Sequence, residues 1–509
     1  MTILDYAAAH PDELALDDLT RARTFAEMVD RSVRAGHLVT DAFGIGRGGH
    51  IAMLLGNRVE FCEVALGSLL AGVWFTPVNW HLTAEEVAYI LDDSGAGLLV
   101  ADPEFEATAR AAAKLAVSPV PVVVAGDELD AALAAASAEP FDLEADAGGS
   151  MLYTSGTTGR PKGVRRPRAS TVQAQLIATA APGRLLRHEG GGPHLVTGPL
   201  YHAAPLGFAS IDLHNGAGLI LMPRWDPMRA LSLIEERRVQ NSHFVPTMFV
   251  RCLRLPDDVR AAFDPSSLRT ILHGAAPVAP SVKERMIEWW GPVLLEYWGS
   301  TEGGVFTLVD SATWLTKPGT VGKAIPTYEV FAVDADHNRL PPGEIGTLYT
   351  RNLITTDVFE YHDAPEKTAG AHLEPGVFTM GDVGWVDDEG FVFLSDRAAN
   401  MIISGGVNIY PAEIEQVLIE HPAVADVGVF GIPDDEWGES VKAAIELIDG
   451  YEPSPELERE ILAFARERLA GYKVPRSIDF EIELPRHPTG KLYTRLLRDK
   501  YWQREGRLI

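Results

Sequence analysis

Short apolar runs alternate with amphipathic helical patterns from the N-terminus to about Leu295, and this alternation constrains the fold most strongly. Two helix starts are marked by caps: Thr83 with Glu86 forms a capping box, and Asp226 precedes a proline. Such alternation predicts an α/β fold with layers of helices on parallel strands. The expected strands are His50–Leu55, Gly97–Val100, Pro121–Val124, Leu219–Met222, Ser242–Val245, Thr270–Leu272 and Val293–Leu295.

The pattern changes after about residue 396. Helical patterns at 413–420 and 455–469 are mixed with strand patterns at 424–430, 442–448 and 478–483. This is a small α+β module of about 110 residues, which is enough to fold as its own domain. A chain of 509 residues also exceeds a single compact core. We therefore predict an N-terminal domain at 1–396 and a C-terminal domain at 397–509.

Composition narrows the class of protein. A net charge of −27 argues against binding to nucleic acid or to anionic membranes, both of which attract cationic surfaces. The longest uncharged stretches are interrupted by glycine and proline, so we expect no membrane insertion. Cys62 and Cys252 are too few for a disulfide framework, which suits a reducing cytosol. The cytoplasm is the expected location, and a homodimer is compatible with the sequence.

One polar, glycine-rich run extends from Tyr153 to Gly163 and reads YTSGTTGRPKG. Glycines let backbone N–H groups approach an anion, hydroxyl groups add donors, and Lys162 adds a mobile positive charge. The spacing differs from that of a P-loop NTPase. We expect a phosphate-binding loop formed by Thr154, Ser155, Gly156, Thr157, Thr158, Gly159 and Lys162.

This run resembles the phosphate loop of the adenylate-forming enzymes, which include acyl-CoA synthetases, adenylation domains of peptide synthetases and luciferases. Further motifs appear in the family's order between residues 5 and about 498. The resemblance implies a large multi-sheet α/β N-terminal domain that binds ATP and the acyl substrate. It also implies a small, mobile α+β C-terminal domain that acts as a lid.

A second glycine-rich segment, from Glu296 to Gly304, follows a predicted strand. A carboxylate beside a hydroxyl in such a turn suits Mg²⁺ and phosphate. The segment is similar to the family pattern Tyr-Gly-x-Thr-Glu, with Trp298 in the tyrosine position. By this resemblance Glu302 and Thr154 would hold Mg²⁺, Thr301 would contact a phosphate oxygen, and Trp298 would stack on adenine. Further residues implied in the nucleotide pocket are Gly274, Ala275, Ala276 and Gly299.

The segment from Phe378 to Gly384 resembles the family's Thr-Gly-Asp motif, with Met380 inserted. A carboxylate can accept two hydroxyl donors, which matches a ribose diol. The resemblance therefore assigns Asp382 to the ribose and Arg397 to the same nucleotide. Upstream, the segment 199–205 resembles the motif in which a histidine, here His202, lines the acyl pocket. The implied pocket residues are Tyr201, His202, Pro205, Phe244, Met248, Ser300, Val305 and Phe306.

The last motifs belong to the C-terminal domain. Gly405 and Gly406 would line a tunnel for the pantetheine arm of coenzyme A, and Ala399 stands at the family's hinge position. The segment 485–491 matches the family motif whose lysine, here Lys491, enters the adenylation site. Its ammonium group would offset the negative charge that gathers during attack on the α-phosphate.

The resemblance implies an AMP-forming acyl-CoA ligase that uses ATP, Mg²⁺ and coenzyme A. The mostly apolar pocket favours a hydrophobic fatty, aryl or alicyclic acid. A stand-alone adenylation enzyme that loads a separate acyl-carrier protein remains the main alternative. A luciferase-like oxygenase and a nucleotide-binding sensor without turnover are further alternatives.

Overall fold

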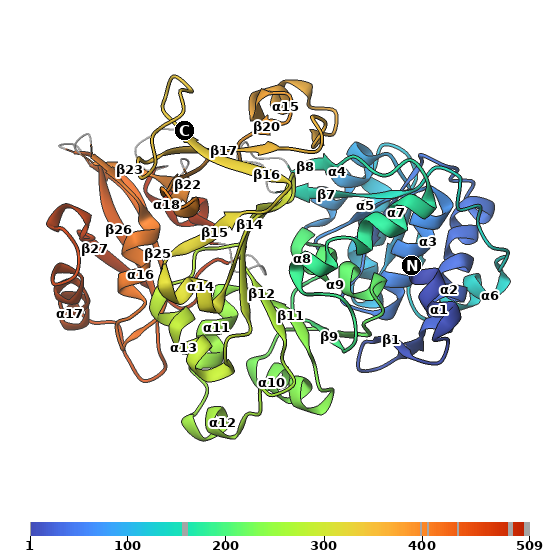
Figure 1. The fold of residues 1–509 in the computed structure, drawn as a ribbon, viewed down its shortest axis with the longest axis horizontal. Coiled ribbons are helices and arrows are strands. Elements are labelled where there is room, and N and C mark those ends of the chain that lie inside the picture. Colours follow the sequence, from blue (N-terminus) through green and yellow to red (C-terminus); the bar gives the residue numbers. More distant parts are fainter. Residues whose placement is uncertain are drawn as a thin grey trace.

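The structure is a computed structural model that describes residues 2–154, 161–397, 400–404, 407–434, 437–486 and 492–502. The described strands form three sheets (Figure 1). Two of them lie in the part of the chain up to residue 397. The third lies at the C-terminal end, drawn in orange and red at the left of Figure 1.

The smaller N-terminal sheet has a parallel centre and an antiparallel edge. In spatial order its strands are β18 (Glu360–Tyr361), β8 (Lys162–Arg165), β7 (Gly149–Thr154), β4 (Trp74–Pro77), β3 (His50–Leu54), β5 (Ala96–Ala101) and β6 (Val122–Val124). The associated helices are α1 (Ile3–Ala9), α2 (Phe25–His37), α3 (Val59–Ala71), α4 (Ala84–Ser94), α5 (Glu106–Leu115), α6 (Asp127–Ala135) and α7 (Val172–Ala180). The helix α4 begins at the predicted capping box, in which Thr83 and Glu86 bond each other's backbone N–H.

The larger sheet changes from parallel to antiparallel between β13 and β14. Its parallel strands are β1 (Leu14–Asp17), β10 (Leu219–Leu221), β9 (His194–Val196), β11 (Asn241–Phe244), β12 (Thr270–His273) and β13 (Leu294–Ser300). The remaining strands are β2 (Ala22–Thr24), β14 (Gly304–Asp310), β15 (Thr320–Ala324), β16 (Tyr328–Val333), β17 (Gly346–Asn352), β19 (His372–Glu374), β20 (Val377–Phe378), β21 (Asp382–Val386) and β22 (Phe391–Arg397). The helices are α8 (Gly183–Leu186), α9 (Ala203–His214), α10 (Pro227–Glu236), α11 (Pro246–Leu253), α12 (Asp257–Ala262), α13 (Pro280–Trp290), α14 (Ser311–Thr316) and α15 (Pro365–Ala371).

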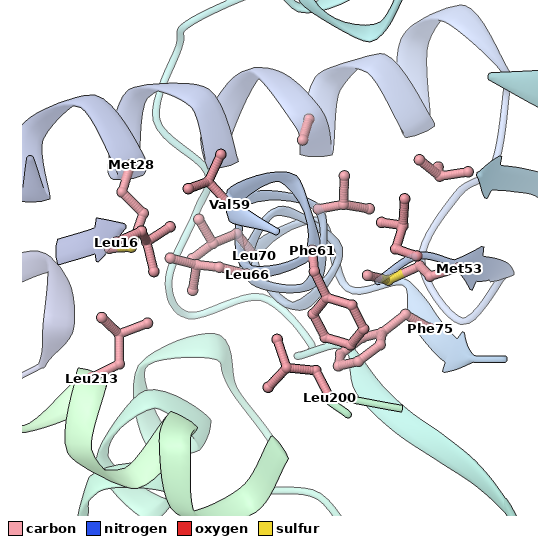
Figure 2. Close-up of a cluster of buried hydrophobic side chains, with 14 of the residues drawn as sticks. Leu16, Met28, Met53, Val59, Phe61, Leu66, Leu70, Phe75, Leu200 and Leu213 are labelled. Atoms are coloured by element: carbon pink, nitrogen blue, oxygen red, sulfur yellow. The ribbon is translucent and has the colours of Figure 1, made fainter. Parts of the chain in front are cut away.

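A shared hydrophobic core joins these two sheets (Figure 2). The apolar helix α3 is buried within it and contributes Val59, Phe61, Leu66 and Leu70. Around them lie Leu16 of β1, Met28 of α2, Met53 of β3, Phe75 of β4, Leu200, and Leu213 of α9. Each large apolar side chain so buried contributes about 1.5–3 kcal/mol. The turn that precedes α9 is thereby fixed against the smaller sheet.

The C-terminal sheet packs with its own helices. Its strands are β23 (Ile402–Ser404), β24 (Val407–Ile409), β25 (Val424–Asp434), β26 (Gly438–Leu447) and β27 (Ser477–Glu481). The helices are α16 (Pro411–Leu418), α17 (Pro455–Arg466) and α18 (Thr494–Trp502). One contact with the larger part of the chain is direct, since the Arg254 guanidinium donates a hydrogen bond to the Val424 carbonyl at 2.8 Å.

The predicted α/β class is confirmed, and the expected strands agree with β3, β5, β6, β10, β11, β12 and β13 to within a few residues. The α+β pattern of the C-terminal module is confirmed as well. The division at residue 396 stays a prediction; β22 ends at Arg397, and the C-terminal sheet begins at Ile402. Within the described ranges, every helix is too short or too polar to cross a membrane.

Candidate active site

The predicted phosphate loop joins two antiparallel strands. β7 ends at Thr154, β8 begins at Lys162, and these two residues are direct partners across the pair. Residues 155–160 lie outside the described ranges, and with them the predicted ligands Ser155, Gly156, Thr157, Thr158 and Gly159. The structure therefore fixes Thr154 and Lys162, the two ends of the predicted phosphate loop, side by side.

Glu302 lies in the turn between β13 and β14, together with Thr301. Its side chain is largely buried, with 8% of the residue exposed, and its Oε1 accepts a hydrogen bond from the Tyr361 hydroxyl at 2.9 Å. Ser300 supports the turn, because its Oγ accepts the Gly303 N–H at 3.1 Å. The strand β7, the predicted phosphate loop and the strand β8 are called the phosphate hairpin below. The strand that contains Tyr361 pairs with β8, so the hydrogen bond from Tyr361 to Glu302 connects the Glu302 turn to the phosphate hairpin.

Two glycines near this turn are required by close backbone approaches. A Cβ on Gly299 would lie 2.2 Å from the Gly304 carbonyl oxygen, and one on Gly274 would lie 2.6 Å from that of Tyr297. Ala275 follows with a positive φ of 69°, an unusual conformation for a residue with a side chain. Gly274, Ala275 and Ala276 come directly after β12 and leave little side-chain volume at this edge of the sheet.

Trp298 and Asp382 form a buried pair. The indole Nε1 donates to Asp382 Oδ2 at 2.8 Å, and only 7% of Trp298 and 8% of Asp382 is exposed. Asp382 also lies opposite Arg397 in the β21–β22 pairing, and the assignment of both residues to one nucleotide stays a prediction. Stacking of Trp298 on adenine stays a prediction. The hydrogen bond to Asp382 is a feature that no sequence motif revealed.

His202 is the N-cap residue of α9 and lies beside Tyr201, with 4.2 Å between their ring centroids. Asn57 fixes this turn through three hydrogen bonds: its side-chain amide donates to the Gly198 and Met222 carbonyls and accepts the Leu200 N–H. Sequence reasoning missed Asn57, which lies more than a hundred residues away along the chain.

Two residues predicted for the acyl pocket, Phe306 and Phe244, are packed in aromatic clusters, and their place in the pocket stays a prediction. Phe306 is fully buried in an aromatic cluster with Trp298 and Phe378, while its neighbour Val305 packs against the separate apolar cluster that includes Phe208 and Tyr297. The register of β13 and β14 shifts at this point, so Phe306 is the extra residue of a β-bulge opposite Trp298 and Gly299. Phe244 is likewise a core residue, stacked on Phe249 and edge-on to Trp290.

A buried polar cluster lies beyond these residues. Nδ1 atoms of His188 and His194 are 2.9 and 2.7 Å from Asp212 Oδ2, and Asn241 donates to the same carboxylate. Burial alone would raise the pKa of Asp212, but the hydrogen bonds from the two histidines lower it to about 2. The ionised carboxylate therefore ties α9 to β9 and β11. Its residues form no sequence motif, so the sequence did not reveal it.

Other predicted residues belong to the C-terminal motifs. Ala399, Gly405, Gly406 and Lys491 lie outside the described residues. Tyr493, two positions after Lys491, is described. Burial raises the pKa of the Tyr201 hydroxyl, and the charge of an ionised Tyr493 raises it further. Tyr493 is thus within electrostatic reach of the turn that contains Tyr201 and His202.

Comparison with known proteins gives consistent matches over nearly the whole chain. Residues 4–356 match the family model described as AMP-binding enzyme, and residues 413–491 match that of the AMP-binding enzyme C-terminal domain. The fatty acid–[acyl-carrier-protein] ligase ScoC of Streptomyces coeruleorubidus is 32% identical over 96% of this chain and 93% of its own. The long-chain-fatty-acid–CoA ligase FadD13 of Mycobacterium tuberculosis is 34% identical over 94% and 93%.

A feruloyl-CoA synthase from an Amycolatopsis species is 36% identical over 94% of both chains. Among solved structures, the anthranilate CoA ligase AuaEII in complex with anthranoyl-AMP superposes with a TM-score of 0.88 and 25% identity, covering 100% of this chain and 98% of the other. These matches include both domains, so they support one common architecture from the phosphate hairpin to the C-terminal module.

Proposed function

Because the chain belongs to the AMP-binding enzyme family, we propose that it is an AMP-forming acyl-CoA ligase acting on a hydrophobic carboxylic acid. The observation that most supports this is the hydrogen bond from Tyr361 to Glu302, which brings the Glu302 turn to the phosphate hairpin. Trp298 and Asp382 add a nucleotide site on the neighbouring strands. The names of relatives, which include fatty-acyl and aryl-CoA ligases, support the same activity.

The residues around Glu302 fit a magnesium ion. Mg²⁺ favours one or two carboxylates together with phosphate oxygens and water. Glu302 offers one carboxylate, and Thr154 offers a hydroxyl at the start of the phosphate connection. Bound here, the ion would neutralise phosphate charge while the chain's own residues hold the nucleotide in place. We therefore assign Mg²⁺, ATP and coenzyme A as the small molecules required.

In the first half-reaction the substrate carboxylate attacks the α-phosphorus of ATP. A new C(O)–O–P bond forms, and pyrophosphate leaves with the electron pair of the broken P–O bond. Such chemistry depends on positioning and on charge stabilisation. Lys162 would bind the outer phosphates, Asp382 and Arg397 the ribose, and Lys491 the charge at the α-phosphate.

In the second half-reaction the thiol of coenzyme A attacks the acyl-adenylate and releases AMP. We propose that the C-terminal domain rotates near Ala399, withdraws Lys491 and brings Gly405 and Gly406 over the site. Small residues at a hinge can absorb the backbone change. One site would then serve two reactions in turn.

The substrate class is inferred from the apolar residues near His202 and Val305. The cluster of Phe208, Tyr297 and Val305 is apolar, which favours fatty, aryl or alicyclic acids. We also propose a cytoplasmic location, since Cys62 and Cys252 are both free. Whether the enzyme is a homodimer is a separate question that light scattering would answer.

The decisive experiment supplies purified protein with Mg·ATP and a panel of acids, with coenzyme A or an acyl-carrier protein as acceptor. We expect acyl-CoA and AMP with at least one hydrophobic acid. Lys491→Ala should lower pyrophosphate exchange by at least about a hundredfold, the size of a lost transition-state charge contact. Adenylate formation without a CoA thioester, but with loading of the carrier protein, would favour the carrier-protein alternative suggested by ScoC.

A further inference from the structure

The segment from β18 to α15 forms a wall beside the phosphate hairpin that the assigned motifs do not include. Its backbone is fixed there: Tyr361 pairs with Val164 of β8, and the His362 N–H donates to the Gly163 carbonyl at 2.8 Å. The His362 ring contacts the Asp93 carbonyl at 2.8 Å on the other side. The backbone at Tyr361 and His362 is therefore held beside the start of β8, the strand that begins at Lys162, and α15 follows directly.

Two lysines face a common hollow at this wall. A cavity of about 760 Å³ is lined by Lys162 of the hairpin and by Tyr361 and Lys367 of the segment. Within the described ranges neither lysine forms an ion pair with a carboxylate. Asp363 and Glu366 also line the hollow, but both are exposed, so water screens their charge. Among the described residues, the hollow thus contains two lysines that form no ion pair with the carboxylates lining it.

Lys367 is close to the Glu302 site as well. Its Nζ lies 4.8 Å from the centroid of the Tyr361 ring, whose hydroxyl donates to Glu302. Partial burial lowers the pKa of Lys367, the charge of Lys162 lowers it further, and the charge of Glu302 opposes this. Two like charges within electrostatic reach of each other repel, and a polyanion placed between them would remove that cost.

We propose that Lys367 binds the β- and γ-phosphates of ATP, and then pyrophosphate, opposite Lys162, while the Tyr361 hydroxyl orients Glu302. This inference rests on the proposed function and extends it to the leaving group. In the first half-reaction the bond from the α-phosphorus to the bridging oxygen breaks, and Lys367 stabilises the charge that pyrophosphate carries away. The second half-reaction contains no pyrophosphate, so Lys367 has no part in it.

The test is equilibrium binding of magnesium pyrophosphate by calorimetry, without any acid substrate. Lys367→Ala should weaken binding about tenfold, as expected for one charge-assisted contact at a partly exposed site. Lys367→Arg should restore most of the affinity because it keeps the charge. The control is Lys114→Ala, which removes an exposed lysine from α5 and should leave binding unchanged. Wild-type affinity in Lys367→Ala, with its fold intact by circular dichroism, would overturn the proposal.

Kinetics separate this proposal from the assignment of the overall reaction. Lys367→Ala should slow adenylate formation but leave the rate of thioester formation from synthetic acyl-AMP unchanged. An equal loss in both half-reactions would contradict a pyrophosphate-side role. Failure of the wild type to activate any acid would reject the ligase assignment, yet the pyrophosphate titration would still decide the role of Lys367.

Tyr361→Phe tests the second part of the proposal. It keeps the ring beside Lys367 and removes only the hydroxyl that donates to Glu302. We expect a higher magnesium concentration for half-maximal pyrophosphate binding, with a smaller change at saturating magnesium. An unchanged magnesium requirement would show that the hydroxyl does not orient the carboxylate.

Discussion

Trp298 stands at the position where the family pattern has tyrosine, and it alters the proposed nucleotide site while keeping an aromatic ring there. Its larger ring fills space next to Phe306, and its N–H reaches the carboxylate assigned to the ribose. A tryptophan N–H can only donate, so it fixes Asp382 Oδ2 as an acceptor. The rigid indole of Trp298 thereby fixes the orientation of the whole Asp382 carboxylate, including the oxygen lone pairs that the indole does not use. We infer that Trp298 positions Asp382.

Trp298→Phe should therefore weaken nucleotide binding while the site keeps an aromatic ring. Loss of one hydrogen bond to a buried carboxylate costs about 1.5–3 kcal/mol, which corresponds to about 10- to 150-fold in AMP affinity. Calorimetric titration with AMP measures this, and thermal unfolding checks that the fold persists. AMP affinity equal to that of the wild type would show that Asp382 needs no help from the indole.

At the scale of elements, the parallel strands were predictable because each is a short apolar run between glycine, proline or helix-cap residues. The surroundings of Val305 and Phe306 could not be predicted from the sequence. A sequence motif does not show that β13 and β14 form an antiparallel hairpin with a register shift at Trp298, and this pairing decides which side Phe306 faces. The Asp212 cluster could not be predicted for a related reason: His188 lies in a loop, His194 in a strand and Asp212 in a helix.

Buried histidines in these elements give the fold a predictable pH dependence. Burial lowers the pKa of His243 to about 3, well below its value in an unfolded chain. The folded state then binds fewer protons than the unfolded state, so the stability from His243 is complete above pH 6.5. It is lost as the pH falls toward 3, by about 2 kcal/mol at pH 5.

Calorimetry between pH 7.5 and about 5 should show a falling unfolding temperature, and His243→Gln should flatten the curve. His10→Gln provides a control, because His10 lies on the surface. A slope in His243→Gln as steep as in the wild type would assign the effect to other groups.

At the scale of the whole molecule, the charged residues Arg254, Asp426 and Arg486 lie where the C-terminal part of the chain contacts the N-terminal part. Arg254 follows α11 and donates to the Val424 carbonyl, and the nearby carboxylate of Asp426 favours its charged form although burial disfavours it. Asp426 itself pairs with Arg486, which lies in the segment 485–491 that ends at Lys491. A rotation of the C-terminal domain would have to break the contact between Arg254 and Val424.

Arg254→Ala should consequently act unequally on the two half-reactions. Removing one hydrogen bond and its charge costs about 1 kcal/mol, so the arrangement in which Arg254 contacts Val424 should become about fivefold less populated. Pyrophosphate exchange should fall by a similar factor, while thioester formation from acyl-AMP should hold or rise, because the opposing arrangement gains population. Arg229→Ala, on the distant surface of α10, serves as the control. Equal slowing of both half-reactions would mean that the Arg254 contact stabilises the fold rather than one arrangement of the two domains.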